Sequence, residues 1–167
     1  MSKPKIGVSR CLLGDAVRYD GQSKPCNIII DQLTRRFELI PICPEVEAGL
    51  TIPRPPVQLS GSIEQPRLIG RDDPNIDITE LMLDYCQNKI PELKELDGFI
   101  FKSRSPSCGL HSTPVFIDGD CITETSSGVF VRAVQATYSN LPMIEEIQLE
   151  SPDVMNEFIK SVSTHKT

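Results

Sequence analysis

The stretch "DGFIFKSRSPSCG" (97–109) passes abruptly from an apolar run to a loop of small polar residues. "DGFIF" is short and aromatic, which is typical of a buried strand. The serines, proline and glycine that follow favour turns, and Cys108 lies among them. The sequence therefore predicts a strand over 97–101 that ends in a loop carrying a thiol.

Two earlier strands are predicted to end in the same way. "KIGVS" (5–9) is followed by Cys11, and "ELIPI" (38–42) is followed directly by Cys43. Three further segments have weaker strand patterns: 66–70, 142–146, and 114–123, which is either an irregular excursion or a hairpin turning at Asp118-Gly119.

Helical patterns separate these strands. They cover 27–37 with Asn27 as the N-cap, 78–89 capped by Asp77, 128–138, and a C-terminal helix at about 152–163. The segment 45–61 contains Pro53, Pro55 and Pro56, so it is expected to be an ordered, extended loop.

This alternation predicts the fold class. We expect one α/β domain over 1–167, with a mostly parallel sheet flanked by helices in a Rossmann- or flavodoxin-like arrangement. The carboxyl ends of parallel strands meet at one edge, where such sheets bind ligands. Cys11, Cys43 and Cys108 should therefore lie close together.

Composition narrows the class of protein. The 167 residues are 39% hydrophobic and 24% charged, as in ordinary globular chains. The net charge of −6 argues against a polymeric nucleic acid as partner, so a small molecule is expected. Basic residues such as Arg54, Arg71, Lys102 and Arg104 are assigned to solvated surface, with a local pocket for an anionic or polar ligand as the alternative. No membrane-spanning run or signal peptide is evident, which favours the cytoplasm; the oligomeric state is left open.

The six cysteines are judged one at a time, because no CxxC pair is present. Cys26, Cys86 and Cys121 are interpreted as small buried hydrophobes. The three strand-end cysteines form a candidate metal site, for which thiolates select zinc, copper(I) or an iron–sulfur cluster. A fourth ligand could come from His111 or Glu45, or the position could stay open for substrate.

A second hypothesis makes Cys108 a nucleophile with His111 as its base, although His111 is more simply an exposed loop residue. Glu45 is either a surface or capping carboxylate or a general acid/base, with Glu47 as a natural control. Ser105 and Ser107 are most simply turn residues whose hydroxyls cap backbone groups.

Three blocks of sequence bear a resemblance to a known family. "SRCLLGDAVRYDG" (9–21), "CPEVEAGLTIPRPP" (43–56) and "KSRSPSCG" (102–109) resemble the thiouracil desulfurase family, and the similarity extends over about 5–145. The resemblance implies an α/β domain with a [4Fe-4S] cluster held by Cys11, Cys43 and Cys108. It also implies that Glu45 is the acid/base carboxylate and Ser105 the active-site serine.

The implied reaction is a non-redox hydrolysis. One iron lacks a protein ligand and is expected to bind the sulfur of a thiolated pyrimidine such as 2-thiouracil, as free base or nucleoside. The products are the oxo-pyrimidine and hydrosulfide. Two positions depart from the family pattern, Ala48 where paired glycines are usual and Gln58 where a carboxylate is usual. Two other functions remain open: a non-catalytic iron–sulfur or zinc protein that traffics or senses sulfur, and the Cys108 hydrolase.

Overall fold

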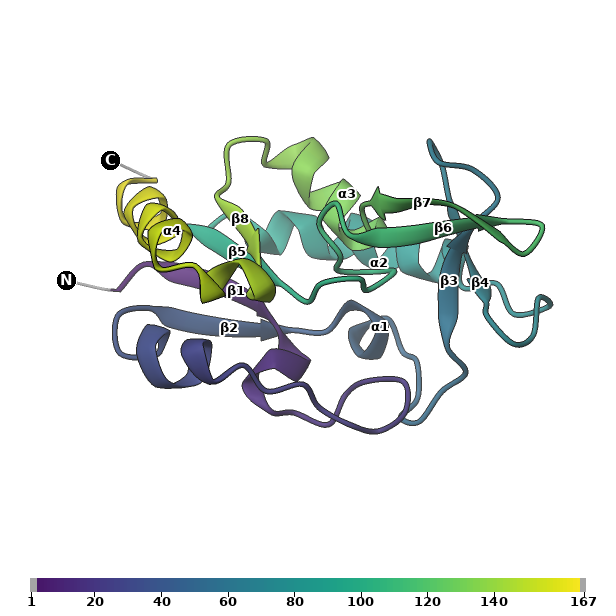
Figure 1. Ribbon diagram of the computed structural model, residues 1–167, viewed down its shortest axis with the longest axis horizontal. Helices are drawn as coiled ribbons and strands as arrows, with labels where there is room; N and C mark the ends of the chain where they lie inside the picture. Colours follow the sequence, from purple (N-terminus) through teal and green to yellow (C-terminus); the bar gives the residue numbers. More distant parts are fainter. Residues whose placement is uncertain (1–2, 166–167) are drawn as a thin grey trace.

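A four-stranded parallel sheet forms the centre of the molecule (Figure 1), and the computed structural model describes residues 3–165. Its strands lie in the order β2-β1-β5-β8, and each pair is parallel. Their bounds are β1 Lys5–Ser9, β2 Glu38–Ile42, β5 Gly98–Phe101 and β8 Met143–Glu145. Counted within this sheet the order is 2-1-3-4, as in flavodoxin-like sheets.

Strand β5 is buried on both faces, as its apolar sequence predicted. Phe99 and Phe101 stack with ring centroids 4.1 Å apart in one core cluster, whereas Ile100 belongs to the cluster on the opposite side. Gly7 of β1 is needed for this packing, because a Cβ there would lie 2.7 Å from the Phe99 ring. Helices on both faces complete the α/β arrangement.

Those helices are α1 Pro44–Glu47, α2 Thr79–Lys89, α3 Val129–Thr137 and α4 Pro152–Thr164. Helices α2 and α3 contribute Met82 and Phe130 to the first core cluster, and α4 contributes Phe158 to the second. Four short helical segments complete the set: η1 Arg10–Leu13, η2 Ile29–Leu33, η3 Ile90–Leu93 and η4 Glu146–Glu150. Among residues 3–165 no helix is long and apolar enough to cross a membrane.

A second sheet corrects the expectation of a single sheet. It has the order β4-β3-β6-β7, formed by β3 Val57–Ser60, β4 Arg67–Gly70, β6 Thr113–Ile117 and β7 Asp120–Ser126. Only β3 and β6 pair in parallel; the other pairs are antiparallel. The β6–β7 connection is the predicted hairpin at Asp118-Gly119, where both residues have positive φ.

Three local predictions are wrong. The segment 45–61 is not loop throughout, because it starts within α1 and contains β3. The helix expected over 27–37 is shorter than predicted: residues 27–33 are helical, with η2 in the π-helical form, and a turn follows over 34–36. Cys121 lies exposed on the edge strand β7, and Cys26 is half-buried; only Cys86 is buried in the core as expected.

Candidate functional site

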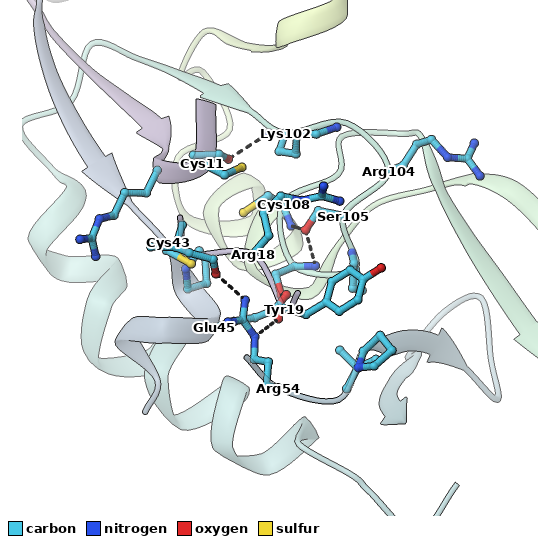
Figure 2. A pocket seen from close by; sticks show the side chains of 18 of the residues that line it. Cys11, Arg18, Tyr19, Cys43, Glu45, Arg54, Lys102, Arg104, Ser105 and Cys108 are labelled. Carbon is cyan, nitrogen blue, oxygen red and sulfur yellow. Dashed lines mark hydrogen bonds and ion pairs between the residues drawn. The ribbon is translucent and has the colours of Figure 1, made fainter. Parts of the chain in front are cut away.

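The three strand-end cysteines line a single pocket of about 340 Å³. Cys11 lies in η1 directly after β1, Cys43 follows β2, and Cys108 lies in the loop after β5. Figure 2 shows their side chains on facing walls of this pocket. All six cysteines are free thiols, so no disulfide competes for these sulfurs.

Burial keeps the pocket thiols protonated. It raises the pKa of Cys11 to about 11, against the opposing effect of the Lys102 and Arg18 cations. Burial likewise raises the pKa of Cys43 and, well above its usual range, that of Cys108. A protonated thiol is a poor nucleophile at neutral pH, which disfavours the Cys108 hydrolase. A bound metal would instead displace the protons.

The donor set fits a cluster better than a single ion. Within residues 3–165, no three His, Cys, Asp or Glu side chains are close enough to hold one metal ion together. An iron–sulfur cluster makes a different demand, because each cysteine binds a separate iron and the sulfurs stand apart around the group. Two buried thiols and the half-buried Cys43 line one pocket, which offers a cluster one ligand fewer than four.

The start of α3 fixes the loop that carries Cys108. The backbone N–H of Val129 donates to the Pro106 carbonyl at 3.0 Å, and that of Phe130 donates to the Ser107 carbonyl at 3.1 Å. The first N–H groups of a helix have no acceptor within the helix, and here the loop carbonyls accept their hydrogen bonds. Gly128 permits this approach, because a Cβ there would lie 2.4 Å from the Ser107 backbone.

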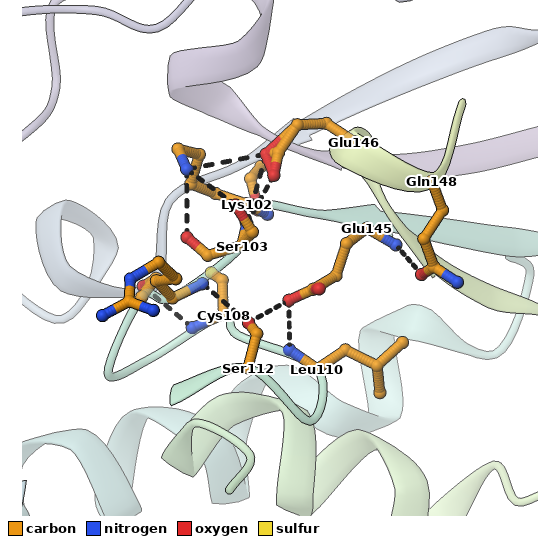
Figure 3. Close-up of polar contacts among 11 residues, drawn as sticks. Lys102, Ser103, Cys108, Leu110, Ser112, Glu145, Glu146 and Gln148 are labelled. Atoms are coloured by element: carbon orange, nitrogen blue, oxygen red, sulfur yellow. Dashed lines mark hydrogen bonds and ion pairs between the residues drawn. The ribbon is translucent and has the colours of Figure 1, made fainter. Parts of the chain in front are cut away.

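Two adjacent glutamates at the end of β8 hold the same loop at both ends (Figure 3). Both carboxylate oxygens of Glu146 accept from the Ser103 N–H, at 2.7 and 3.1 Å. Glu145 accepts from the Leu110 N–H at 2.9 Å and from the Ser112 hydroxyl. The cysteine loop is therefore braced without a bound ligand.

Glu45 lies at the pocket wall in the first turn of α1, with its side chain only 14% exposed. One carboxylate oxygen accepts from Arg54 Nε at 3.0 Å and the other from the Ser107 hydroxyl at 2.9 Å. Glu47, two residues on, does not line the pocket; it accepts from the Tyr85 hydroxyl and pairs with Lys89. Glu47 also accepts from the Cys43 N–H at 3.0 Å, so it supports the pocket from outside while Glu45 lines it.

Ser105 also lines the pocket, and its hydroxyl oxygen accepts from the N–H groups of Ser107 and Cys108 at 3.2 and 3.0 Å. Its turn-capping role is thus present in the structure. His111 does not line this pocket: the backbone turns at positive φ there, and its Nδ1 lies 3.2 Å from the Ser127 hydroxyl. His111 is therefore wrong both as fourth ligand and as base for Cys108.

The pocket is locally cationic although the chain is acidic overall. Arg54, Arg71, Lys102 and Arg104 all line it. Arg54 and Lys102 are partly buried, which corrects their assignment to solvated surface, whereas Arg71 and Arg104 are exposed as that assignment expected. The guanidinium of Arg71 lies 5.9 Å from the centre of the Tyr19 ring, and Arg18 lies at the same distance from that ring. The surroundings suit a polar or anionic ligand.

Comparison with known proteins agrees with this geometry. A family model described as 2-thiouracil desulfurase matches residues 6–146. The chain belongs to this family. It is 32% identical over 110 residues to the uncharacterized protein YbbK of Bacillus subtilis (strain 168), which covers 62% of this chain and 72% of the relative. A solved structure of a [4Fe-4S]-dependent thiouracil desulfidase, TudS, matches with a TM-score of 0.72 and 28% identity, covering 93% of this chain and 97% of that one.

Several pocket residues of this desulfurase-family chain were missed from its sequence. Ser107 was interpreted as a turn residue and Arg54 as surface, yet both bind Glu45. The pair Glu145–Glu146 was interpreted only as strand. A signal was present in the sequence, because two acidic residues end a short apolar strand. If such a strand is buried, its carboxylates need hydrogen-bond donors, which backbone N–H groups can supply.

Proposed function

We propose that the chain is a [4Fe-4S]-dependent desulfurase that hydrolyses a thiolated pyrimidine such as 2-thiouracil, as free base or nucleoside. Water replaces sulfur at the thiocarbonyl carbon, so the products are the oxo-pyrimidine and hydrosulfide, and no net electrons are transferred. The observation that carries the proposal is the meeting of three strand-end thiols in one pocket of a desulfurase-family chain.

Cys11, Cys43 and Cys108 would hold the cluster through their thiolates. When bound, the cluster supplies an iron without a protein ligand, a Lewis acid toward the sulfur of the substrate. The Lys102 and Arg18 cations favour the thiolate form of Cys11, which supports ligation there.

Glu45 is the proposed acid/base group. A carboxylate has about four positions that accept hydrogen bonds, and Arg54 and Ser107 occupy two of them. The remaining positions can take a proton from the attacking water and return it to the departing group. A low exposed fraction, 14%, keeps bulk water from competing at this carboxylate.

Ser105 is proposed to orient the substrate. Its hydroxyl oxygen already accepts two backbone N–H groups, which fixes the oxygen in the pocket wall. The single O–H is left to donate to a polar atom of the pyrimidine. Ser105→Ala should therefore weaken turnover and also loosen the cysteine loop.

The test is anaerobic reconstitution with iron and sulfide, followed by incubation with 2-thiouracil and assay of uracil and sulfide. We expect turnover by the wild type, and loss of both cluster absorbance and turnover in each of Cys11→Ala, Cys43→Ala and Cys108→Ala. Glu45→Gln should keep the absorbance but lose activity by about 100-fold or more, the usual range for a general acid/base.

The comparison variant is Glu47→Gln, in the same helical turn: Glu47 pairs with Lys89, accepts from the Tyr85 hydroxyl, and accepts from the Cys43 N–H at 3.0 Å, a contact that the glutamine side-chain oxygen can keep. This variant should lower the free energy of unfolding while turnover stays within about threefold of wild type. A loaded protein that releases no sulfide from any thiolated base or nucleoside would favour the sulfur-trafficking alternative. Zinc in place of iron in anaerobically purified protein would also contradict the proposal.

A further inference from the structure

We infer that Arg54 and Ser107 form a clamp that positions the Glu45 carboxylate for proton transfer. This inference rests on the proposed role of Glu45 and adds two positioning residues to the site. It stands on contacts among three segments that lie apart in the sequence: the loop at 51–56, helix α1 and the cysteine loop.

Arg54 is an unusually buried cation. Its side chain is 6% exposed, and its Nε donates to Glu45 at 3.0 Å. A buried guanidinium is costly unless its charge and its N–H groups are all met, so this pairing specifies one geometry. Arg54 pairs with no other carboxylate among the ion pairs of the described chain.

The remaining donors of Arg54 fix the guanidinium itself. One terminal nitrogen donates to the Val17 carbonyl at 2.9 Å, and the other donates to the Thr51 carbonyl at 3.2 Å. The backbone N–H of Arg54 also donates to the Tyr19 carbonyl at 2.8 Å. Two backbone carbonyls therefore hold the planar guanidinium in place beside Glu45, an arrangement that a lysine ammonium cannot reproduce.

Ser107 fixes the other carboxylate oxygen. Ser107 is only 1% exposed, and its hydroxyl donates to Glu45 at 2.9 Å. Ser107 itself is held by its neighbours, since its N–H donates to Ser105 and its carbonyl accepts from the start of α3. With one oxygen held by Arg54 and the other by Ser107, the carboxylate plane is defined.

The clamp also links proton transfer to the thiol site. Ser107 immediately precedes Cys108, so the residue that orients Glu45 is built into the loop that carries a proposed cluster ligand. A displacement of that loop would move the Glu45 carboxylate together with Cys108. The geometry thus ties the general base to the reacting centre without direct contact between Glu45 and the cysteine.

The first test uses steady-state kinetics of the loaded protein. We expect Arg54→Gln to lower kcat by about 100-fold with KM within threefold, Arg54→Lys to recover only a small part of that loss, and Ser107→Ala to lower kcat by about tenfold. Arg67→Gln is the control for loss of an ion-paired arginine, because Arg67 pairs with Asp77 and Glu80 at the surface, outside the pocket. A raised KM with unchanged kcat in Arg54→Gln would overturn the clamp and indicate that Arg54 only lines the substrate pocket.

The second test needs no turnover. Infrared difference spectra of the cluster-free protein, wild type minus Glu45→Gln, isolate the Glu45 carboxylate band. The same difference is then taken in the Arg54→Gln and in the Ser107→Ala backgrounds. We expect the band to shift in both and to stay unchanged in the Arg67→Gln background.

The two tests separate the clamp from the function. An unshifted band in both Arg54→Gln and Ser107→Ala would overturn the clamp, whatever the kinetics. A shifted band in a protein that never releases sulfide would uphold the clamp and reject the desulfurase proposal.

Discussion

At the scale of single residues, the pocket holds ionisable groups in surroundings that differ from water. Burial raises the pKa of all three pocket thiols, those of Cys11, Cys43 and Cys108. Such perturbed groups cluster where a protein binds or reacts. They also make stability depend on pH.

We predict that the cluster-free protein loses stability between pH 9 and pH 11. Cys11 and Cys86 have folded pKa values of about 11 against an ordinary value of 9.0. Below pH 9 the folded and unfolded chains both keep these thiol protons, so the stabilising contribution is fully present. Above pH 9 the unfolded chain releases them first, and the free energy of unfolding falls. Urea denaturation under reductant at pH 8 and pH 10.5 measures the loss, of the order of 1 kcal/mol per thiol.

The control is Cys86→Val, which keeps an apolar side chain in α2 and removes one of the two thiols. Its stability should fall less steeply over the same pH range than that of the wild type. Because lysines and other groups titrate equally in both proteins, only the difference between the two slopes reports on Cys86. Equal slopes would contradict the prediction.

At the scale of elements, the contact between α3 and the cysteine loop is the most sensitive point. We predict that Gly128→Ala destabilises this contact, since the new Cβ would lie within 2.8 Å of three backbone atoms of Ser107 and Cys108. Overpacking of this kind costs about 1–3 kcal/mol. Iron bound per chain after reconstitution should fall by at least half.

Gly119→Asn is the matched control for that substitution. Gly119 lies in the β6–β7 hairpin with positive φ and open space around it, and asparagine tolerates this conformation. Its iron content should equal that of the wild type. If Gly128→Ala also loads fully, the loop is less tightly docked on α3 than the contacts indicate.

The elements differ in how much their sequences reveal. "DGFIF" and the strands before Cys11 and Cys43 carry their own apolar signal, so their order along the chain predicted that the thiols would meet. Strand β3 carries no such signal, because four residues with a single buried apolar side chain, Leu59, beside three prolines resemble a loop. It exists only because β4 and β6 lie on either side to pair with it.

The site shows the same division. Its cysteines and Glu45 could be found because they directly follow predicted strands. The partners of those residues could not, because Arg54–Glu45, Ser107–Glu45 and Glu145–Ser112 are tertiary contacts between segments that nothing in the local sequence pairs. His111 is the exposed loop residue that the sequence favoured, and the contact with Cys108 suggested by nearness in sequence does not form.

At the scale of the whole molecule, two core clusters and the hydrogen bonds to the cysteine loop lead us to expect a fold that does not depend on a bound group. We predict that removing iron with a chelator leaves the far-ultraviolet circular dichroism unchanged to within a few per cent. The melting temperature should fall, because ligand binding stabilises only the folded state. Collapse of the spectrum on chelation, as in zinc fingers, would contradict this prediction.

The docking of the cysteine loop on α3 has a consequence for biogenesis. The walls of the pocket begin at Ser9, yet the loop at Cys108 is held by Gly128 to Phe130 and, further along the chain, by Glu145 and Glu146. A chain emerging from the ribosome therefore cannot finish the pocket until most of its length has been synthesised. A cluster that needs all three thiols in place would then have to be inserted after these segments are made.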